Sequence, residues 1–262
     1  MTTPRPATTA ALLAPQVLGL LTSATRYILN ETLEHRRLRS EIDKLARVDA
    51  AGSWTLRAIY LTAMGNASEA REAVRNALRL GVSPDIQGSL ATNVYINFAN
   101  FSDALDLLAK AADPRGGYFS NRIAWLVRAG GIRTAAGYCE IARGMGLDIP
   151  ELPIDLARAV DALDTLDARP VSDAEIALML STAGAVFCEH GLMTSRSETP
   201  ELMQFEAGAF CFQFPLDVSP AEAATIAIEA SERLADLPFS SSAATLGFRV
   251  HRPQARPEPV VA

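Results

Sequence analysis

The chain has 262 residues, 49% hydrophobic and 21% charged, and this composition excludes an intrinsically disordered protein. Its formal net charge of −6 argues against broad nucleic-acid binding, which needs many cationic side chains to displace counterions. No apolar run reaches the roughly 18 residues of a membrane span. Three widely spaced cysteines, without a C-x-x-C motif, indicate neither a disulfide framework nor a zinc site. We therefore expect a folded cytoplasmic protein that has no metal or cofactor and does not bind membranes.

The N-terminal region predicts a flexible segment followed by one long helix. Residues 1–14 are rich in Thr, Pro and Ala, although a single cation before apolar residues also resembles a targeting segment. Pro15 fits the first turn of a helix that runs towards Val48. Its apolar stripe is Leu38, Ile42, Leu45 and Val48. The opposite face carries the basic cluster His35, Arg36, Arg37 and Arg39. This cluster fits a solvated face, or a contact with nucleic acid.

Residues 52–150 predict a series of helical hairpins. In the first hairpin the turn is Met64-Gly65-Asn66, since glycine tolerates a positive φ. The apolar stripe of its second helix recurs 34 residues later and again, more loosely, 31 residues after that. The three stripes are Ala70, Val74 and Ala77, then Ala104, Leu108 and Ala111, then Ala135, Cys139 and Ala142.

This layout resembles the tetratricopeptide repeat, whose period is about 34 residues. The chain departs from that family in places: Arg57 and Ala58 replace the usual Leu-Gly pair, and the second turn has Ala99 where glycine is usual. A generic array of α-hairpins is the alternative. The resemblance implies that the first helix of each hairpin lines a concave surface that holds a peptide or a partner helix. The corresponding residues here are Thr55, Ile59, Thr62, Ser89, Asn93, Ile96, Asn97 and Arg128.

The C-terminal part predicts two more helices and then a change of periodicity. Residues 154–167 suit an amphipathic helix, and the capping box Ser172–Glu175 begins another that ends at Gly191. Alternating apolar residues then predict strands at 209–218 and 244–252, with a further strand near 201–207. Between them, Ser219–Glu222 is a second capping box, for a helix to about Asp236.

The expected fold is mainly α, with hairpin repeats of the tetratricopeptide type followed by a small α/β module. The division is a flexible 1–14, a helical repeat domain at 15–171, a helix with the α/β module at 172–252, and a flexible tail at 253–262. A sheet of this size cannot bury both faces alone, so it is expected to dock onto the array or onto a partner.

These features favour a non-catalytic adaptor, chaperone or regulator that binds another protein or a peptide. One alternative is a nucleic-acid-associated regulator that uses residues 35–39. Another is an enzyme with a cysteine and histidine site in the C-terminal half, drawn from Cys188, His190, Cys211 and His251. Cys188 and His190 are two positions apart on one helix and point in different directions, which disfavours a catalytic pair between them.

Overall fold

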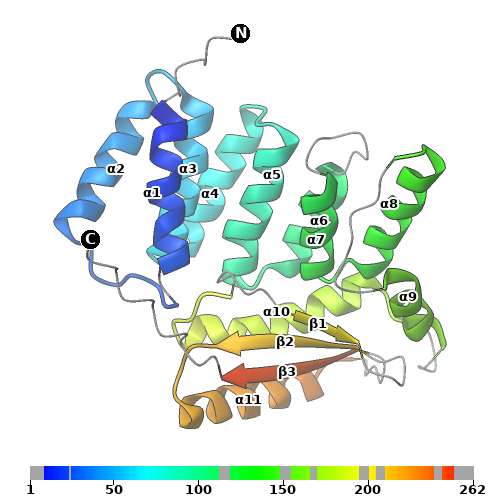
Figure 1. The fold of residues 1–262 in the computed structure, drawn as a ribbon. Coiled ribbons are helices and arrows are strands. Elements are labelled where there is room, and N and C mark those ends of the chain that lie inside the picture. Colours follow the sequence, from blue (N-terminus) through cyan, green and yellow to red (C-terminus); the bar gives the residue numbers. More distant parts are fainter. Residues whose placement is uncertain are drawn as a thin grey trace, which may run out of the picture.

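The computed structural model describes residues 9–23, 25–111, 119–147, 155–165, 170–194, 201–204, 210–238 and 244–250. The fold is mainly helical, with a small sheet near the C-terminus, as expected (Figure 1). Helices stand side by side through the first two thirds of the chain, and α10, the sheet and α11 lie along one end of them. The predicted tail at 253–262 and residues 1–8 lie outside the described residues.

The N-terminal prediction of one long helix is wrong. The chain forms α1 (Thr9–Ser23), with Pro15 inside it, and a separate α2 (Leu33–Leu45). The segment between them is held by other parts of the chain, because the Tyr27 N–H donates to the Gly191 carbonyl at 3.1 Å and the Ile28 N–H to the Ala63 carbonyl at 2.8 Å. These distant partners have no local sequence signal.

Helix α2 begins at a cap that the sequence analysis overlooked. The Thr32 hydroxyl accepts from the His35 N–H, and the His35 ring accepts from the Thr32 N–H, which makes a capping box. Leu38 is partly buried, and Ile42 and Leu45 are buried, as the stripe predicted. Val48 lies beyond the helix and is 81% exposed, so it does not belong to the stripe.

Three helical hairpins follow. The first consists of α3 (Ala50–Ala63) and α4 (Ala67–Arg79). In the second, α5 (Pro84–Leu90) continues through the π-helical turn η1 (Ala91–Tyr95) and the 3₁₀ turn η2 (Ile96–Phe98), and α6 (Phe101–Ala111) returns. The third consists of α7 (Phe119–Arg128) and α8 (Ile132–Gly144).

The three hairpin turns have the same geometry. One residue in each has a left-handed backbone: Gly65 with φ 75°, Ala99 with φ 57° and Gly130 with φ 89°. The N–H of the next residue reaches back to the carbonyl five positions earlier. These bonds are Asn66 to Leu61 at 2.9 Å, Asn100 to Tyr95 at 2.8 Å and Gly131 to Leu126 at 2.8 Å. They satisfy carbonyls that each helix end would leave unpaired.

The predicted stripes of the second helices are buried. In α4 and α8 all three positions are covered, and in α6 Ala104 and Leu108 are covered, whereas the side chain of Ala111 lies outside the described residues. Small side chains at these positions let the paired helices approach closely, and the most extensive contact between described helices is that of α3 with α4.

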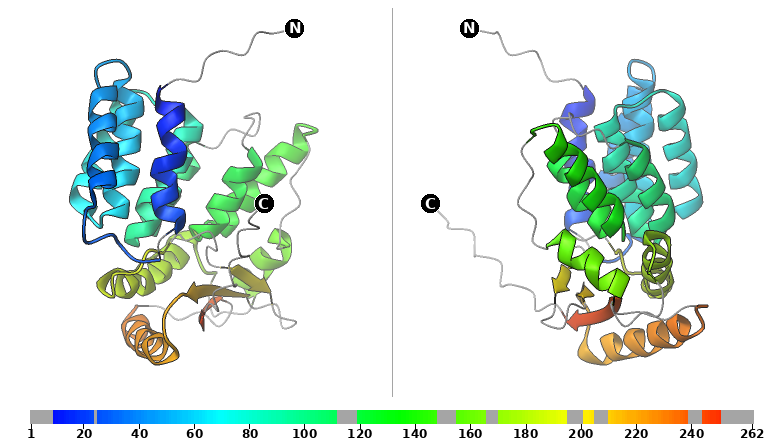
Figure 2. Two further views of the ribbon diagram at one scale, coloured as in Figure 1. Left: turned by 60° about the vertical axis from the view of Figure 1, so that its left-hand side comes forward. Right: turned by 90° about the vertical axis from the view of Figure 1, so that its right-hand side faces the viewer.

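Helices α9 (Leu156–Thr165) and α10 (Asp173–Glu189) follow the hairpins, and α10 lies across their turn ends (Figures 1 and 2). The predicted capping box is present: the Ser172 hydroxyl accepts from the Glu175 N–H, and the Glu175 carboxylate accepts from the Ser172 N–H at 2.9 Å. Helix α10 packs closely against the turns at Ala99 and Gly130, and so it contacts the second and third hairpins.

The C-terminal sheet contains β1 (Glu201–Gln204), β2 (Phe210–Leu216) and β3 (Ala244–Val250), and α11 (Pro220–Ala235) connects the last two strands. β1 pairs antiparallel with β2, whereas β2 pairs parallel with β3, with Phe212 opposite Leu246. The predicted order of strand, strand, helix and strand is confirmed. Ser219 caps α11, but the Glu222 carboxylate binds Arg26 at 2.6 Å, so the second capping box is incomplete.

The sheet docks onto the helices, as expected from its size. Phe212 and Phe214 are buried, and the Phe214 ring meets the Phe187 ring of α10 edge-on, with centroids 5.0 Å apart. These residues belong to a core that also contains buried residues of the helices from α6 to α11. A second core unites α1 to α5. Tyr95 packs at the edge of both cores.

Candidate protein-binding face

The face predicted to bind a partner is formed by the first helices of the hairpins, and most of its predicted residues are buried. Ser89, Asn93 and Arg128 are partly exposed. The other five, Thr55, Ile59, Thr62, Ile96 and Asn97, have at most 9% of their surface exposed. A partner cannot contact these five in this conformation, so the prediction of a continuous binding surface is corrected to the three partly exposed residues.

On α3 the cause of burial is α1. Leu13, Val17 and Leu21 of α1 belong to the same core as Ile59, and α1 packs along α3. The buried Thr62 hydroxyl is satisfied within its helix, because it donates to the Ala58 carbonyl at 2.8 Å. The Thr55 hydroxyl likewise donates to the Ala51 carbonyl of the same helix at 2.9 Å. The sequence analysis assigned the N-terminal helix no contact with this face.

On the second hairpin the asparagines bind their own helix. The Asn93 amide donates to the Ser89 carbonyl at 2.9 Å, and the Asn97 amide donates to the Asn93 carbonyl at 2.9 Å. Asn93 lies in the π-helical turn η1, a kind of irregularity that often occurs at functional sites. The Asn97 carbonyl in turn accepts from the Tyr27 hydroxyl at 2.6 Å. Asn97 is therefore a structural residue, whereas Asn93 is partly exposed.

On the third hairpin Arg128 is the candidate with a free functional group. It ends α7 and is half-buried, and its guanidinium forms no hydrogen bond or ion pair with the described residues. Burial lowers the pKa of Arg128, since the charged form loses solvation. A desolvated guanidinium is the group that gains most from a carboxylate or carbonyl supplied by a partner.

The second and third hairpins contact each other on this face through α5 and α7. The Trp125 ring of α7 lies against the backbone of Gly88, where an added Cβ would come within 2.4 Å of it. Close by, Arg122 is 3% exposed and its guanidinium binds the Asp85 carboxylate at 3.0 Å. Neither contact could be predicted from the sequence, because neither pair of residues has a recognisable spacing.

The cysteine and histidine residues of the enzyme alternative have separate partners. The Cys188 thiol contacts the Tyr27 hydroxyl at 3.4 Å, and burial raises the pKa of Cys188 and of Tyr27. The His190 ring instead contacts the Glu229 carboxylate at 2.9 Å. His251 lies outside the described residues. A raised thiol pKa opposes thiolate formation, so this geometry gives Cys188 no activation.

The basic cluster of α2 is partly neutralised. The Glu31 carboxylate lies 3.8 Å from the Arg36 guanidinium and 3.9 Å from that of Arg39, and it also accepts from the Tyr60 hydroxyl. His35 serves as the capping partner of Thr32. Arg37 is exposed. This arrangement matches the solvated face better than a surface that tracks phosphates.

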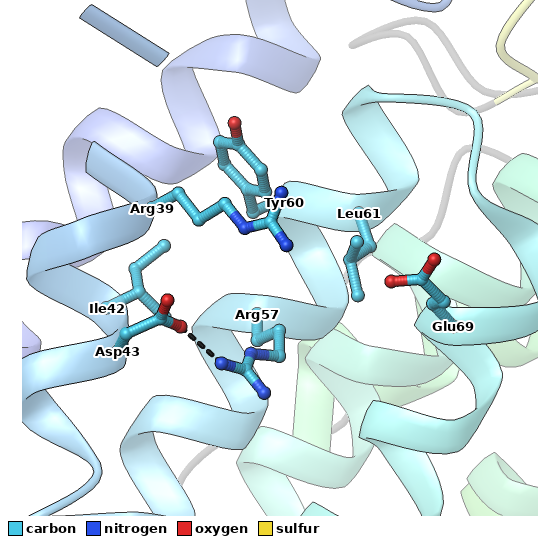
Figure 3. Close-up of a pocket in the computed structure, with 7 residues that line it drawn as sticks. All are labelled: Arg39, Ile42, Asp43, Arg57, Tyr60, Leu61 and Glu69. Carbon is cyan, nitrogen blue, oxygen red and sulfur yellow. Dashed lines mark hydrogen bonds and ion pairs between the residues drawn. The ribbon is translucent and has the colours of Figure 1, made fainter. Parts of the chain in front are cut away.

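Two pockets that the sequence analysis did not predict lie between neighbouring hairpin elements. The first, of about 90 Å³, lies among α2, α3 and α4, where the Arg57 guanidinium pairs with Asp43 and where Arg39 and Glu69 also face the pocket (Figure 3). The second, of about 270 Å³, is lined by α4, Tyr95 and α6. A weak sequence signal existed for it, since Arg71 and Arg75 are four apart and so share a face of α4.

Comparison with protein families, with curated proteins and with solved structures brings no match: no family model fits the chain, and no curated protein or solved structure is significantly similar. Within the described residues, no three His, Cys, Asp or Glu side chains are placed to hold a metal ion. Nor is any helix in the described ranges long and apolar enough to span a bilayer.

Proposed function

We propose that the chain is a cytoplasmic helical repeat protein, similar to tetratricopeptide proteins, that acts as an adaptor, chaperone or regulator by binding another protein. Support for the repeat comes from the three turns of equal geometry and from the buried stripes that follow them. Helix α2 extends this pattern, because Leu38, Ile42 and Leu45 have the same four-then-three spacing as Ala70, Val74 and Ala77.

The single observation that carries the binding role is Arg128. A half-buried guanidinium without a partner among the described residues is costly, and an acidic or carbonyl group on a partner protein would satisfy it. Ser89 and Asn93 provide partly exposed polar groups on the neighbouring first helix. We infer that the partner binds to the second and third hairpins, because α1 already covers the first.

The test is affinity capture with mass spectrometry, comparing Arg128→Glu with Arg143→Glu. Both arginines lie in the last turn of a helix, so both changes place an acid at a helix C-terminus, but Arg143 is exposed on α8. We expect Arg128→Glu to lose a partner that both wild type and Arg143→Glu retain, with unchanged circular dichroism. Equal capture by the two variants would reject this face.

A further inference from the structure

Helix α1 is attached to the first hairpin by aliphatic side chains. It stands alongside α3 (Figure 1), and its buried residues are Leu13, Val17 and Leu21, which recur every four positions. The helix contains no charged residue, so no side-chain ion pair can hold it in place. The side-chain hydrogen bonds of Gln16 and Thr22 end on carbonyl groups of α1 itself. Apolar contact is therefore what holds α1 against α3.

Helix α2 contacts the same helix through polar groups as well. The buried Ser53 hydroxyl of α3 donates to the Ile42 carbonyl at 2.7 Å, and the Arg57 guanidinium pairs with the Asp43 carboxylate. On its other contact, with α4, α3 makes the most extensive helix pairing of the described chain. Loss of α1 would therefore leave α3 packed against two helices.

The threonines of α3 that α1 covers are satisfied within α3. The Thr55 and Thr62 hydroxyls donate to carbonyls of their own helix, and Ile59 between them is apolar. Removal of α1 would therefore expose an apolar surface without leaving either hydroxyl unpaired. Such a surface favours another apolar surface, and it would oppose a charged group, which would lose its solvation there without gaining a partner.

The chain is fixed directly after α1, whereas α1 itself is a poor helix. The Thr25 carbonyl accepts from the Met193 N–H at 3.0 Å, and the Tyr27 N–H donates to the Gly191 carbonyl at 3.1 Å. Inside α1, Pro15 has no N–H for the carbonyl four residues earlier, and proline is the least favourable residue in a helix interior. Helix α1 therefore depends on α3 to remain helical, and its departure would not disturb the segment that follows.

We propose that α1 is a displaceable arm and that, once it has left, α3 binds an amphipathic helix of another protein. Helix α1 itself defines what that helix carries: aliphatic side chains at positions i, i+4 and i+8, and no charge on the same face. A competing helix binds only to those molecules in which α1 is open, so α1 regulates this surface. The surface lies on the first hairpin, is distinct from Arg128 and does not depend on the proposed function.

The probe is a fluorescein-labelled synthetic peptide with the sequence of residues 9–23, titrated with the whole chain and followed by fluorescence anisotropy. Val17→Asp in the protein should open the arm, because Val17 is fully buried and a carboxylate there would lose its solvation. We expect this variant to bind the peptide at least about tenfold more tightly than wild type does, since more molecules are open. The matched change Gln16→Asp adds the same acid on the exposed side of α1 and should bind as wild type does. Absence of saturable peptide binding to a Val17→Asp variant with unchanged circular dichroism overturns the proposal.

A milder variant tests the same arm if Val17→Asp fails to fold. Leu21→Ala leaves a cavity under α1, which weakens the contact and should tighten peptide binding about tenfold or more. An affinity equal to that of wild type would contradict a displaceable arm. Light scattering tests the other possible occupant, a second copy of this chain. A wild-type dimer that Val17→Asp dissociates would assign the surface to α1 of the second copy and would overturn binding of another protein.

Discussion

Ala99 and Gly184 lie at a close approach between the second hairpin and α10. Ala99 has φ 57°, and it is the non-glycine residue of the described chain with a left-handed backbone. A Cβ added at Gly184 would lie 2.8 Å from the Ala99 Cβ and 3.2 Å from the Phe101 ring. A glycine inside a helix costs about 1 kcal/mol relative to alanine. Glycine at position 184 therefore lowers the helix propensity of α10, but its missing side chain lets the turn pack against the helix.

This contact predicts a compensating pair of substitutions. Gly184→Ala should lower the free energy of unfolding by about 1–3 kcal/mol through overpacking. Ala99→Gly added to it removes the clash and about 1 kcal/mol of left-handed strain, so the double variant should be at least as stable as wild type. Chemical denaturation of the four proteins in the cycle measures both effects. If the two substitutions simply add, the methyl contact does not control this interface.

At the scale of elements, the packing of α10 against the hairpin turns determines where the C-terminal half of the chain lies. A Cβ at Gly130 would lie 2.9 Å from Ile176 Cγ2 and 3.0 Å from the Ala177 backbone nitrogen. Gly146, in the turn that ends α8, also has a positive φ, of 69°, but no described residue lies within 4 Å of its added Cβ. Both glycines have a left-handed backbone, which glycine adopts without strain, but they differ in how closely α10 approaches them.

The two glycines therefore predict different costs for the same substitution. Gly146→Ala should lower the free energy of unfolding by about 1–2 kcal/mol, the usual cost of a left-handed alanine. Gly130→Ala should cost at least about 1 kcal/mol more, because α10 must also shift. Urea denaturation measures the difference. Equal losses of the free energy of unfolding would show that α10 can move away from this turn without a further loss of stability.

Sequence periodicity predicted the hairpins, the strands and the capping box of α10, because each depends on residues close together in the chain. It did not predict the break after Ser23, since Tyr27 and Ile28 bind backbone groups of Gly191 and Ala63. It also placed Asn97 on a binding surface, although Tyr27 and Cys188 cover its carbonyl. Burial by distant segments is the information that a single sequence does not contain.

On the scale of the whole molecule, the two cores meet within the second hairpin, near Tyr95 and where the Trp125 ring packs on Gly88, and polar links add to this contact. Arg26, next to α1, binds both the His190 carbonyl at 2.8 Å and Glu222 of α11 at 2.6 Å. The core around α1 to α5 also includes Met193, which follows α10. In the repeat array that we propose, stability is roughly a sum of local and nearest-neighbour terms, so the two cores should open separately.

Two core truncations test this separation. Val74→Ala should increase hydrogen exchange mainly in α1 to α4, and Leu180→Ala, which costs about 2–5 kcal/mol, mainly in α6 to α11. Both side chains are fully buried, so both substitutions leave a cavity. Hydrogen exchange followed by mass spectrometry resolves the segments. Loss of protection throughout the chain in both variants would instead indicate a single cooperative unit.

The length of α10 also limits where a further hairpin could be inserted into this fold. Arrays of hairpins can lengthen by duplication of one unit, since each unit contacts only its neighbours. Here α10 has 17 residues, and at about 1.5 Å per residue it extends roughly 25 Å, whereas packed helices lie about 8–10 Å apart. A hairpin inserted between the second and third would move Ala99 away from Gly130 by about that spacing. Duplication in the middle would thus require a longer α10.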